Sequence, residues 1–197
     1  MKKLRVLAHL SLDGVIAPGG RGEPADFENG GWMGAYRHPA GAAAIVEAQG
    51  PSYDLLLGRR TYDLWAGYWP TMKGGPFADP FNAATKYVAT HRPDSLGWGP
   101  AQGLGPDIVV DVRRLKATDG PDLLIWGSST LTSVLLESGL VDEVVLITYP
   151  VLLGQGTRFF SDRADRRELA FVSSKALPTG ALLNTYRHVG SLRPKSP

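Results

Sequence analysis

The stretch LLIWGSSTL at residues 123–131 continues as TSVLLESG at residues 132–139. Its first four residues have the pattern of a buried strand, and one glycine followed by three hydroxyl residues leads directly into a helix. The start of a helix offers unpaired backbone N–H groups and a positive dipole end, and Gly127 lets an anion approach the backbone. The stretch therefore predicts a phosphate-binding turn, although ordinary helix capping by Ser and Thr would give the same pattern.

Outward from this turn, strands and helices alternate along the chain, which predicts right-handed crossovers and a mainly parallel sheet. The expected strands of this part are residues 4–10, 53–57, 86–90, 107–110 and 123–126. The expected helices are residues 39–49, a short helix from 60–61, 81–85, 111–116 and 129–138. Three further strands without helices between them, at 141–149, 168–176 and 181–188, predict an antiparallel C-terminal edge. The expected class is α/β, with a central mixed sheet and helices on both faces.

The composition is that of one compact domain, since 43% of the 197 residues are hydrophobic and 20% are charged. We expect a single domain over residues 1–190 and a tail over 191–197. A net charge of +2 favours neither a nucleic-acid nor a membrane partner. The chain has no cysteine, which excludes disulfides and zinc–thiolate sites. No apolar stretch approaches the roughly 20 residues of a membrane helix, so we expect a cytoplasmic protein.

Polar residues follow three of the expected strands, at 58–61, 90–92 and 127–130. In an open α/β sheet, ligands bind outside the carboxyl ends of the strands, so these segments are expected to line one crevice. Their hydroxyl, guanidinium and backbone N–H groups suit a pyrophosphate and a further phosphate ester. The four histidines lack metal-ligand spacing, so no metal site is expected.

Five segments together resemble the dihydrofolate reductase-like family, and most nearly its branch named for the C-terminal reductase domain of the bifunctional riboflavin-biosynthesis deaminase-reductase. They are LSLDGVIA at 10–17, LLLGRRTYDLW at 55–65, KYVAT at 86–90, LLIWGSSTL at 123–131 and LVDEVVLITYPVLLGQGTRFF at 140–160. The resemblance implies a dihydrofolate reductase-like three-layer fold that binds NADPH across the sheet. Ser128 and Ser129 stand where dihydrofolate reductases have glycines, which favours the riboflavin branch over true folate reduction.

The resemblance also implies which residues meet the cofactor. The segment 58–61 would hold phosphate groups, 90–92 would meet the adenosine side, the turn from 127 would carry the pyrophosphate, and backbone near Ile16 would face the nicotinamide. The candidate cofactor-binding residues are Gly58, Arg59, Arg60, Thr61, Thr90, His91, Arg92, Trp126, Gly127, Ser128, Ser129, Thr130, Leu131 and Ile16.

Three acids are candidates for proton transfer during reduction, namely Asp13, Asp26 and Glu28. Asp13 beside Gly14 is equally explained as a turn residue, and Asp26 and Glu28 as parts of a solvated loop. Aromatic side chains can wall a pocket for a flat heterocycle, and an arginine can meet a substrate phosphate. The candidate substrate-binding residues are Trp32, Tyr149, Phe160 and Arg158.

The function expected from these observations is NADPH-dependent reduction of a small heterocyclic substrate. The nearest named reaction is reduction of 5-amino-6-(5-phosphoribosylamino)uracil in riboflavin biosynthesis. The alternatives are a dihydrofolate- or pterin-reductase-like enzyme, and a nucleotide-binding protein without turnover. We also expect a homodimer, because the apolar C-terminal strands would leave an exposed edge or face.

Overall fold

The computed structural model describes residues 1–17, 31–160 and 166–192. Its main sheet has eight strands in the order β5-β4-β3-β6-β1-β7-β10-β9. The strands are β1 (Leu4–Ser11), β3 (Tyr53–Gly58), β4 (Lys86–Ala89), β5 (Ala101–Leu104), β6 (Asp122–Trp126), β7 (Glu143–Tyr149), β9 (Arg167–Ala176) and β10 (Leu182–Ser191). The six strands from β5 to β7 are mutually parallel, whereas β10 and β9 run antiparallel. This arrangement confirms the expected sheet and its antiparallel edge.

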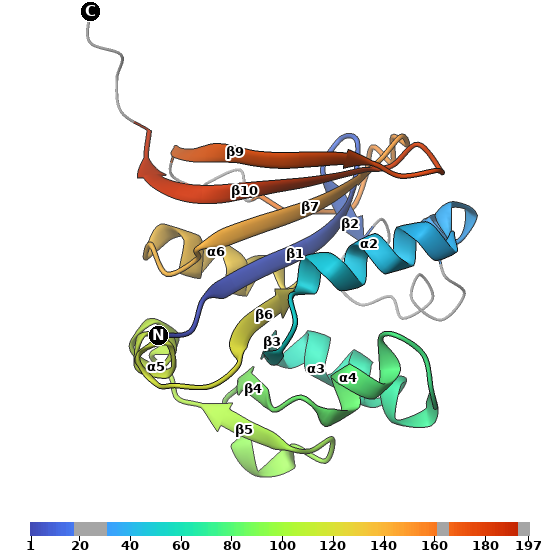
Figure 1. The fold of residues 1–197 in the computed structure, drawn as a ribbon. Coiled ribbons are helices and arrows are strands. Elements are labelled where there is room, and N and C mark those ends of the chain that lie inside the picture. Colours follow the sequence, from blue (N-terminus) through green and yellow to red (C-terminus); the bar gives the residue numbers. More distant parts are fainter. Residues whose placement is uncertain (18–30, 161–165, 193–197) are drawn as a thin grey trace, which may run out of the picture.

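Helices cover both faces of the sheet (Figure 1). The α-helices are α2 (Pro39–Gln49), α3 (Arg59–Ala66), α4 (Ala78–Ala83), α5 (Ile108–Ala117) and α6 (Ser129–Glu137). Short 3-10 helices are η1 (Trp32–Tyr36), η2 (Trp69–Thr71) and η3 (Pro93–Ser95). None of the helices within the described ranges is long and apolar enough to span a membrane.

Two hydrophobic clusters lie on opposite faces of the sheet because successive strand residues point in opposite directions. In β3, Leu55 and Leu57 join the cluster packed by α2, α3 and α4, whereas Leu56 joins the cluster packed by α5 and α6. All three leucines are fully buried. Such apolar runs are typical of parallel strands covered on both faces, which is why the sequence of β3 does not alternate.

One expected element was wrong, and one strand of the main sheet was missed. Residues 107–110 do not form a strand but begin α5, where the Asp107 side chain accepts a hydrogen bond from the Val110 N–H. Asp111 was expected to cap this helix, but it accepts from the Gly105 N–H instead. The missed strand is β5, an edge strand with the weakly apolar sequence AQGL. The helix expected at 81–85 lies slightly earlier, as α4.

A small second sheet joins two loops near the ends of β1 and β7. It consists of β2 (Val15–Ala17) and β8 (Thr157–Arg158), paired antiparallel. The Phe159 N–H donates to the Gly14 carbonyl at 3.0 Å, which extends the pairing. The loop after β1 and the loop after β7 are therefore held together at the carboxyl edge of the parallel strands.

Candidate functional site

Ser128 joins two of the three polar strand ends. The Gly58 N–H donates to the Ser128 hydroxyl oxygen at 3.3 Å, and that hydroxyl donates to Thr61 Oγ1 at 2.9 Å. Ser128 adopts a left-handed backbone conformation with a φ of 45°, which aims its side chain toward β3. The segments 58–61 and 127–130 therefore lie in direct contact.

Arg59 attaches the third strand end to this site. Its guanidinium binds both carboxylate oxygens of Asp63 at 2.8 and 2.9 Å, and its Nη1 donates to Thr90 Oγ1 and Ser95 Oγ at 3.3 and 2.7 Å. The same nitrogen donates to the Arg92 carbonyl at 3.1 Å. Arg59 thus fixes the loop after β4 against α3, and its donors are largely used by the protein.

Two exposed arginines remain beside Arg59. Arg60 and Arg92 line an open depression of about 530 Å³ together with Arg59, Asp63 and Leu64. Two guanidinium groups that converge on one depression can bind a phosphate through several charge-assisted hydrogen bonds. His91, the remaining residue of this segment, is exposed.

The turn between β6 and α6 has the features of a phosphate seat. Gly127 has a φ of 67°, and no protein atom lies within 4 Å of where its Cβ would be. The nine-residue helix α6 begins at Ser129, so the backbone N–H groups of its first turn are free of helical partners. Ser129 and Thr130 border a separate depression of about 470 Å³. These features fit an anionic, phosphate-bearing cofactor.

Not every candidate cofactor residue lies equally near this seat. The side chain of Leu131 is 7% exposed and belongs to the core beneath α6, so only its backbone can meet a ligand. Ile16 packs partly buried against the same core. Trp126 points away from the phosphate seat and lines a neighbouring cavity.

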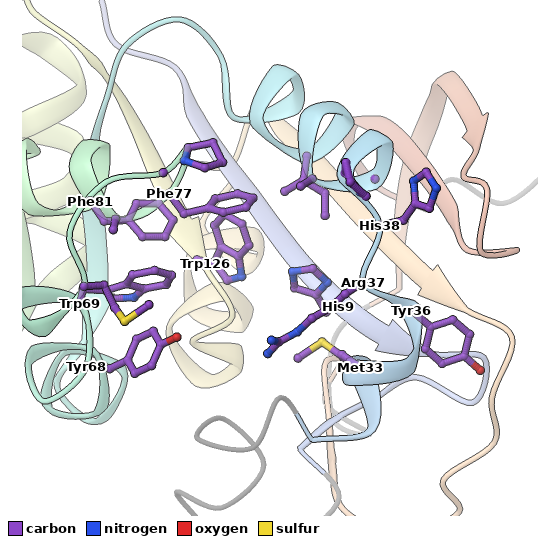
Figure 2. Close-up of a pocket in the computed structure, with 18 of the residues that line it drawn as sticks. His9, Met33, Tyr36, Arg37, His38, Tyr68, Trp69, Phe77, Phe81 and Trp126 are labelled. Atoms are coloured by element: carbon purple, nitrogen blue, oxygen red, sulfur yellow. The ribbon is translucent and has the colours of Figure 1, made fainter.

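This cavity, which we call the aromatic cavity, has a volume of about 600 Å³. Figure 2 shows Tyr68, Trp69, Phe77 and Phe81 on one side, Met33 and Arg37 on the other, and His9 and Trp126 between them. The first group comes from the segment between α3 and α4 and from α4 itself, and the second from η1 and the residue that follows it. A mostly apolar cavity of this size with a few polar groups is typical of small-molecule sites.

His9 was not expected from the sequence to contribute to a site. Its Nδ1 lies 2.8 Å from the Tyr149 hydroxyl oxygen, and its ring centroid lies 5.5 Å from Trp126 and 5.7 Å from Tyr149. Burial lowers the pKa of His9 to about 4 and raises the pKa of Tyr149 to about 12, so both side chains are uncharged near neutral pH. His9 lies two positions after Leu7 on β1, so the two side chains point to the same face of the sheet. This alternation was the sequence signal that could have placed His9 on the side of the cavity.

The candidate substrate residues do not form one group. Tyr149 lines the aromatic cavity, and Trp32 packs edge-on against it with ring centroids 5.2 Å apart. Phe160 and Arg158 instead border the depression beside Ser129 and Thr130. The structure therefore places half of the predicted substrate set at the aromatic cavity and half at the start of α6.

The Asp13 carboxylate is bound by its own neighbourhood. It accepts hydrogen bonds from Ser11 Oγ at 2.6 Å and from the N–H groups of Leu153 and Gly154 at 3.1 and 2.8 Å. The Ser11 hydrogen bond, followed by that of Leu153, lowers the pKa of Asp13 to about 2. These contacts tie the loop after β1 to the loop after β7, as a turn residue would. Asp26 and Glu28 lie outside the described residues.

The mixed eight-stranded sheet with its antiparallel C-terminal edge is an α/β fold of the dihydrofolate reductase-like type. Residues 104–183 match the model of the RibD C-terminal domain family. For these residues the match confirms the resemblance that the sequence indicated.

Known proteins resemble the chain over most of its length. The uncharacterized protein YyaP of Bacillus subtilis is 28% identical over 140 residues, which are 69% of this chain and 74% of YyaP. A putative riboflavin biosynthesis protein from Shewanella sp. PV-4 superimposes with a TM-score of 0.69 at 20% identity, over 95% of this chain and 99% of the other. Dihydrofolate reductase from Enterococcus faecalis, complexed with NADP(H), gives a TM-score of 0.60 at 16% identity, over 94% and 96%. At these identities the two structures show the shared fold.

Proposed function

We propose that the protein is an NADPH-dependent reductase of a small heterocyclic substrate. The observation that carries the proposal is the direct junction of the two sites at β6, where Trp126 lines the aromatic cavity and Gly127 opens the phosphate seat. When bound, NADPH would supply a hydride to a substrate in that cavity. The family match and the NADP(H)-bound Enterococcus structure support the choice of cofactor.

The residues of the chain divide the binding of the dinucleotide among them. Backbone N–H groups at the start of α6, with the hydroxyls of Ser129 and Thr130, would hold the pyrophosphate. Arg60 and Arg92 would bind the 2′-phosphate that distinguishes NADPH from NADH. Ser128 and Arg59 act indirectly, since their hydrogen bonds hold the three strand ends in place.

The most specific form of the proposal is reduction of 5-amino-6-(5-phosphoribosylamino)uracil. The RibD C-terminal domain match and the riboflavin-biosynthesis description of the Shewanella protein support it. Reduction of a pterin or dihydrofolate is the alternative, supported by the fold shared with the Enterococcus enzyme. Steady NADPH oxidation with one of these compounds would identify the reaction, and tight NADPH binding without oxidation of any would favour a nucleotide-binding protein without turnover.

Replacing both Arg60 and Arg92 by Gln is expected to lower the affinity for NADPH at least tenfold and to leave the affinity for NADH unchanged. Losing charge-assisted hydrogen bonds worth about 1.5–3 kcal/mol would produce this effect, and only NADPH carries the 2′-phosphate. The measurement is thermal protection by each dinucleotide, since saturation at 100 times the dissociation constant stabilises a protein by about 2.7 kcal/mol.

The matched control replaces Arg113 and Arg114, two exposed arginines on α5, by Gln. This variant removes the same charge and should bind NADPH like the unchanged protein. Equally weakened NADPH binding in both variants would show that the effect comes from net charge alone. Absence of protection of the unchanged protein by millimolar NADPH would contradict the proposed function itself.

We also infer that two copies of the chain associate through β9. This ten-residue strand is the edge of the main sheet and pairs with β10 alone among the described strands. Phe171 on β9 is 66% exposed and Val172 is 55% exposed. A second β9 running antiparallel would pair the free backbone edge and cover these side chains, and unpaired edges of this kind favour association.

Light scattering at micromolar concentration is expected to give twice the chain mass. Replacing Phe171 by Lys should lower the measured mass toward that of one chain. Two lysines of like charge would then stand where an apolar contact was buried at the symmetry axis. Replacing Val110 by Lys provides the control, since Val110 is 45% exposed on α5, away from β9. A single-chain mass for the unchanged protein would refute the inference.

A further inference from the structure

The aromatic cavity contains one pair of hydrogen-bonded polar side chains from the strands beneath it, His9 and Tyr149. Both line the cavity, and their hydrogen bond leaves His9 Nε2 without a hydrogen-bond partner among the described residues. Figure 2 shows His9 in the space between the two walls, next to Trp126. A ligand lying in that space would therefore meet the free edge of the imidazole.

We propose that His9 donates a hydrogen bond from Nε2 to an acceptor atom on the edge of a flat heteroaromatic substrate, and that Tyr149 orients His9 for this contact. The proposal rests on the proposed function, because only a reductase would turn over the bound ring as a substrate. It names the chemical class that the cavity selects, which is an uncharged or anionic ring with a hydrogen-bond acceptor on its edge.

The tautomer of His9 follows from its partner. A phenol is a much better hydrogen-bond donor than a neutral imidazole N–H, so the Tyr149 O–H donates to Nδ1. Nδ1 then carries no proton, and the single proton of the neutral ring resides on Nε2. Among the described residues, the Tyr149 hydroxyl has no other acceptor that would compete with His9 Nδ1 for its proton. At Nε2, His9 therefore offers the cavity a hydrogen-bond donor and not an acceptor.

The imidazole is neutral because of its surroundings. The aromatic rings of Trp126 and Tyr149 lie beside it, and burial lowers its pKa to about 4. The titratable and charged groups that also line the cavity are Tyr36, Arg37, His38 and Tyr68. None of them is an acid, so no described group of the cavity stabilises a positive charge on His9.

The same set of groups decides which ligand charge the cavity accepts. Its described lining includes no Asp or Glu, whereas Arg37, directly after η1, extends toward the space between the walls (Figure 2). No described carboxylate forms an ion pair with Arg37. A protonated ring would lack a counter-charge here, while an anionic substituent could pair with Arg37 at the mouth of the cavity.

Binding of two probes of equal shape tests the proposal without any dinucleotide. Quinoline carries a ring nitrogen acceptor, and naphthalene carries none. Ligand-observed NMR titration gives the affinity ratio of quinoline to naphthalene for each variant, and comparing ratios between variants cancels the difference in hydrophobicity. His9→Phe keeps an aromatic ring but removes the donor, so the ratio is expected to fall about fivefold, the effect of one hydrogen bond.

Two further variants separate a directed hydrogen bond from a packing effect. His9→Gln places an amide N–H near the position of Nε2 and should retain most of the ratio. Tyr149→Phe removes the hydrogen bond that fixes the tautomer of His9. The affinity ratio of quinoline to naphthalene should therefore fall, while the affinity for naphthalene stays unchanged. If Tyr149 only supported the cavity walls, both probes would weaken equally. The control His188→Phe, on β10 and outside the cavity lining, should leave the ratio unchanged.

The charge preference has its own probe. Arg37→Gln is expected to weaken binding of 2-naphthoate and to leave naphthalene binding unchanged. Equal ratios in the unchanged protein and His9→Phe, or no binding of either probe at millimolar concentration, would overturn the proposal. A preserved ratio together with absence of NADPH protection would instead refute the proposed reductase function and leave the cavity assignment standing.

Discussion

Gly127→Ala is expected to lower the affinity for NADPH ten- to a hundredfold while the protein stays folded. The φ of 67° at this position and the space within 4 Å of the added Cβ mean that the methyl group meets no protein atom. It would instead occupy the place where a phosphate must approach the backbone. Loss of one charge-assisted hydrogen bond costs about 1.5–3 kcal/mol, which sets the size of the effect. Equilibrium titration with NADPH measures it.

The other end of α6 provides the matched control. Gly139 has a φ of 69° and an equally open Cβ position, and it ends the helix that Gly127 precedes. Both alanine variants should lose about 1–2 kcal/mol of folding free energy, the cost of a left-handed L-residue. Only Gly127→Ala should lose NADPH affinity. Unaltered affinity in that variant would remove the turn after β6 from the cofactor site.

Lys86→Ala is expected to destabilise the fold by about 3 kcal/mol at pH 7. Lys86 is 0% exposed, and its ammonium donates to the carbonyls of Asn82 and Gly99 at 2.7 and 3.2 Å. Its Nζ also lies 4.3 Å from the centre of the Trp98 ring. Truncation leaves a cavity and two carbonyls without their donor, and each effect costs about 1–3 kcal/mol. Urea unfolding gives the difference in unfolding free energy.

The stability difference should also depend on pH. Burial lowers the pKa of Lys86 from 10.5 to about 8, so between these values the unfolded chain holds a proton that the folded protein has released. Stability relative to Lys86→Ala therefore rises as the pH increases through that interval. Lys175→Ala is the control, because Lys175 is exposed and, among the described residues, pairs only with Glu47 at 3.3 Å. Its effect should stay within about 1 kcal/mol and show no such rise.

The parallel part of the fold was accessible from the sequence because its strands are short apolar runs that end at polar residues. The segment 107–116 was misjudged because Ile108, Val109 and Val110 favour strands individually. Their role became clear only from the cap at Asp107 and from Val112, which packs one turn after Ile108 against the sheet. Strand β5 has little apolar character, since as an edge strand it needs only one neighbour.

The contact between the segments 58–61 and 127–130 was predictable because both follow strand ends that meet at one edge of the sheet. The pair formed by His9 and Tyr149 was not, because the two residues are 140 positions apart and meet only when β1 pairs with β7. In that pairing His9 lies opposite Ile147, and the tyrosine two residues further on the same face comes within reach. Sequence alternation indicates the face of each strand but not the register between them.

The direct succession of Trp126 and Gly127 has a kinetic consequence. Because the two sites adjoin without overlapping, both reactants can be bound at the same time, as direct hydride transfer in the proposed reductase requires. Initial rates measured against one reactant at several fixed concentrations of the other should then give intersecting reciprocal plots. A parallel pattern, which signals departure of the first product before the second reactant enters, is incompatible with this arrangement.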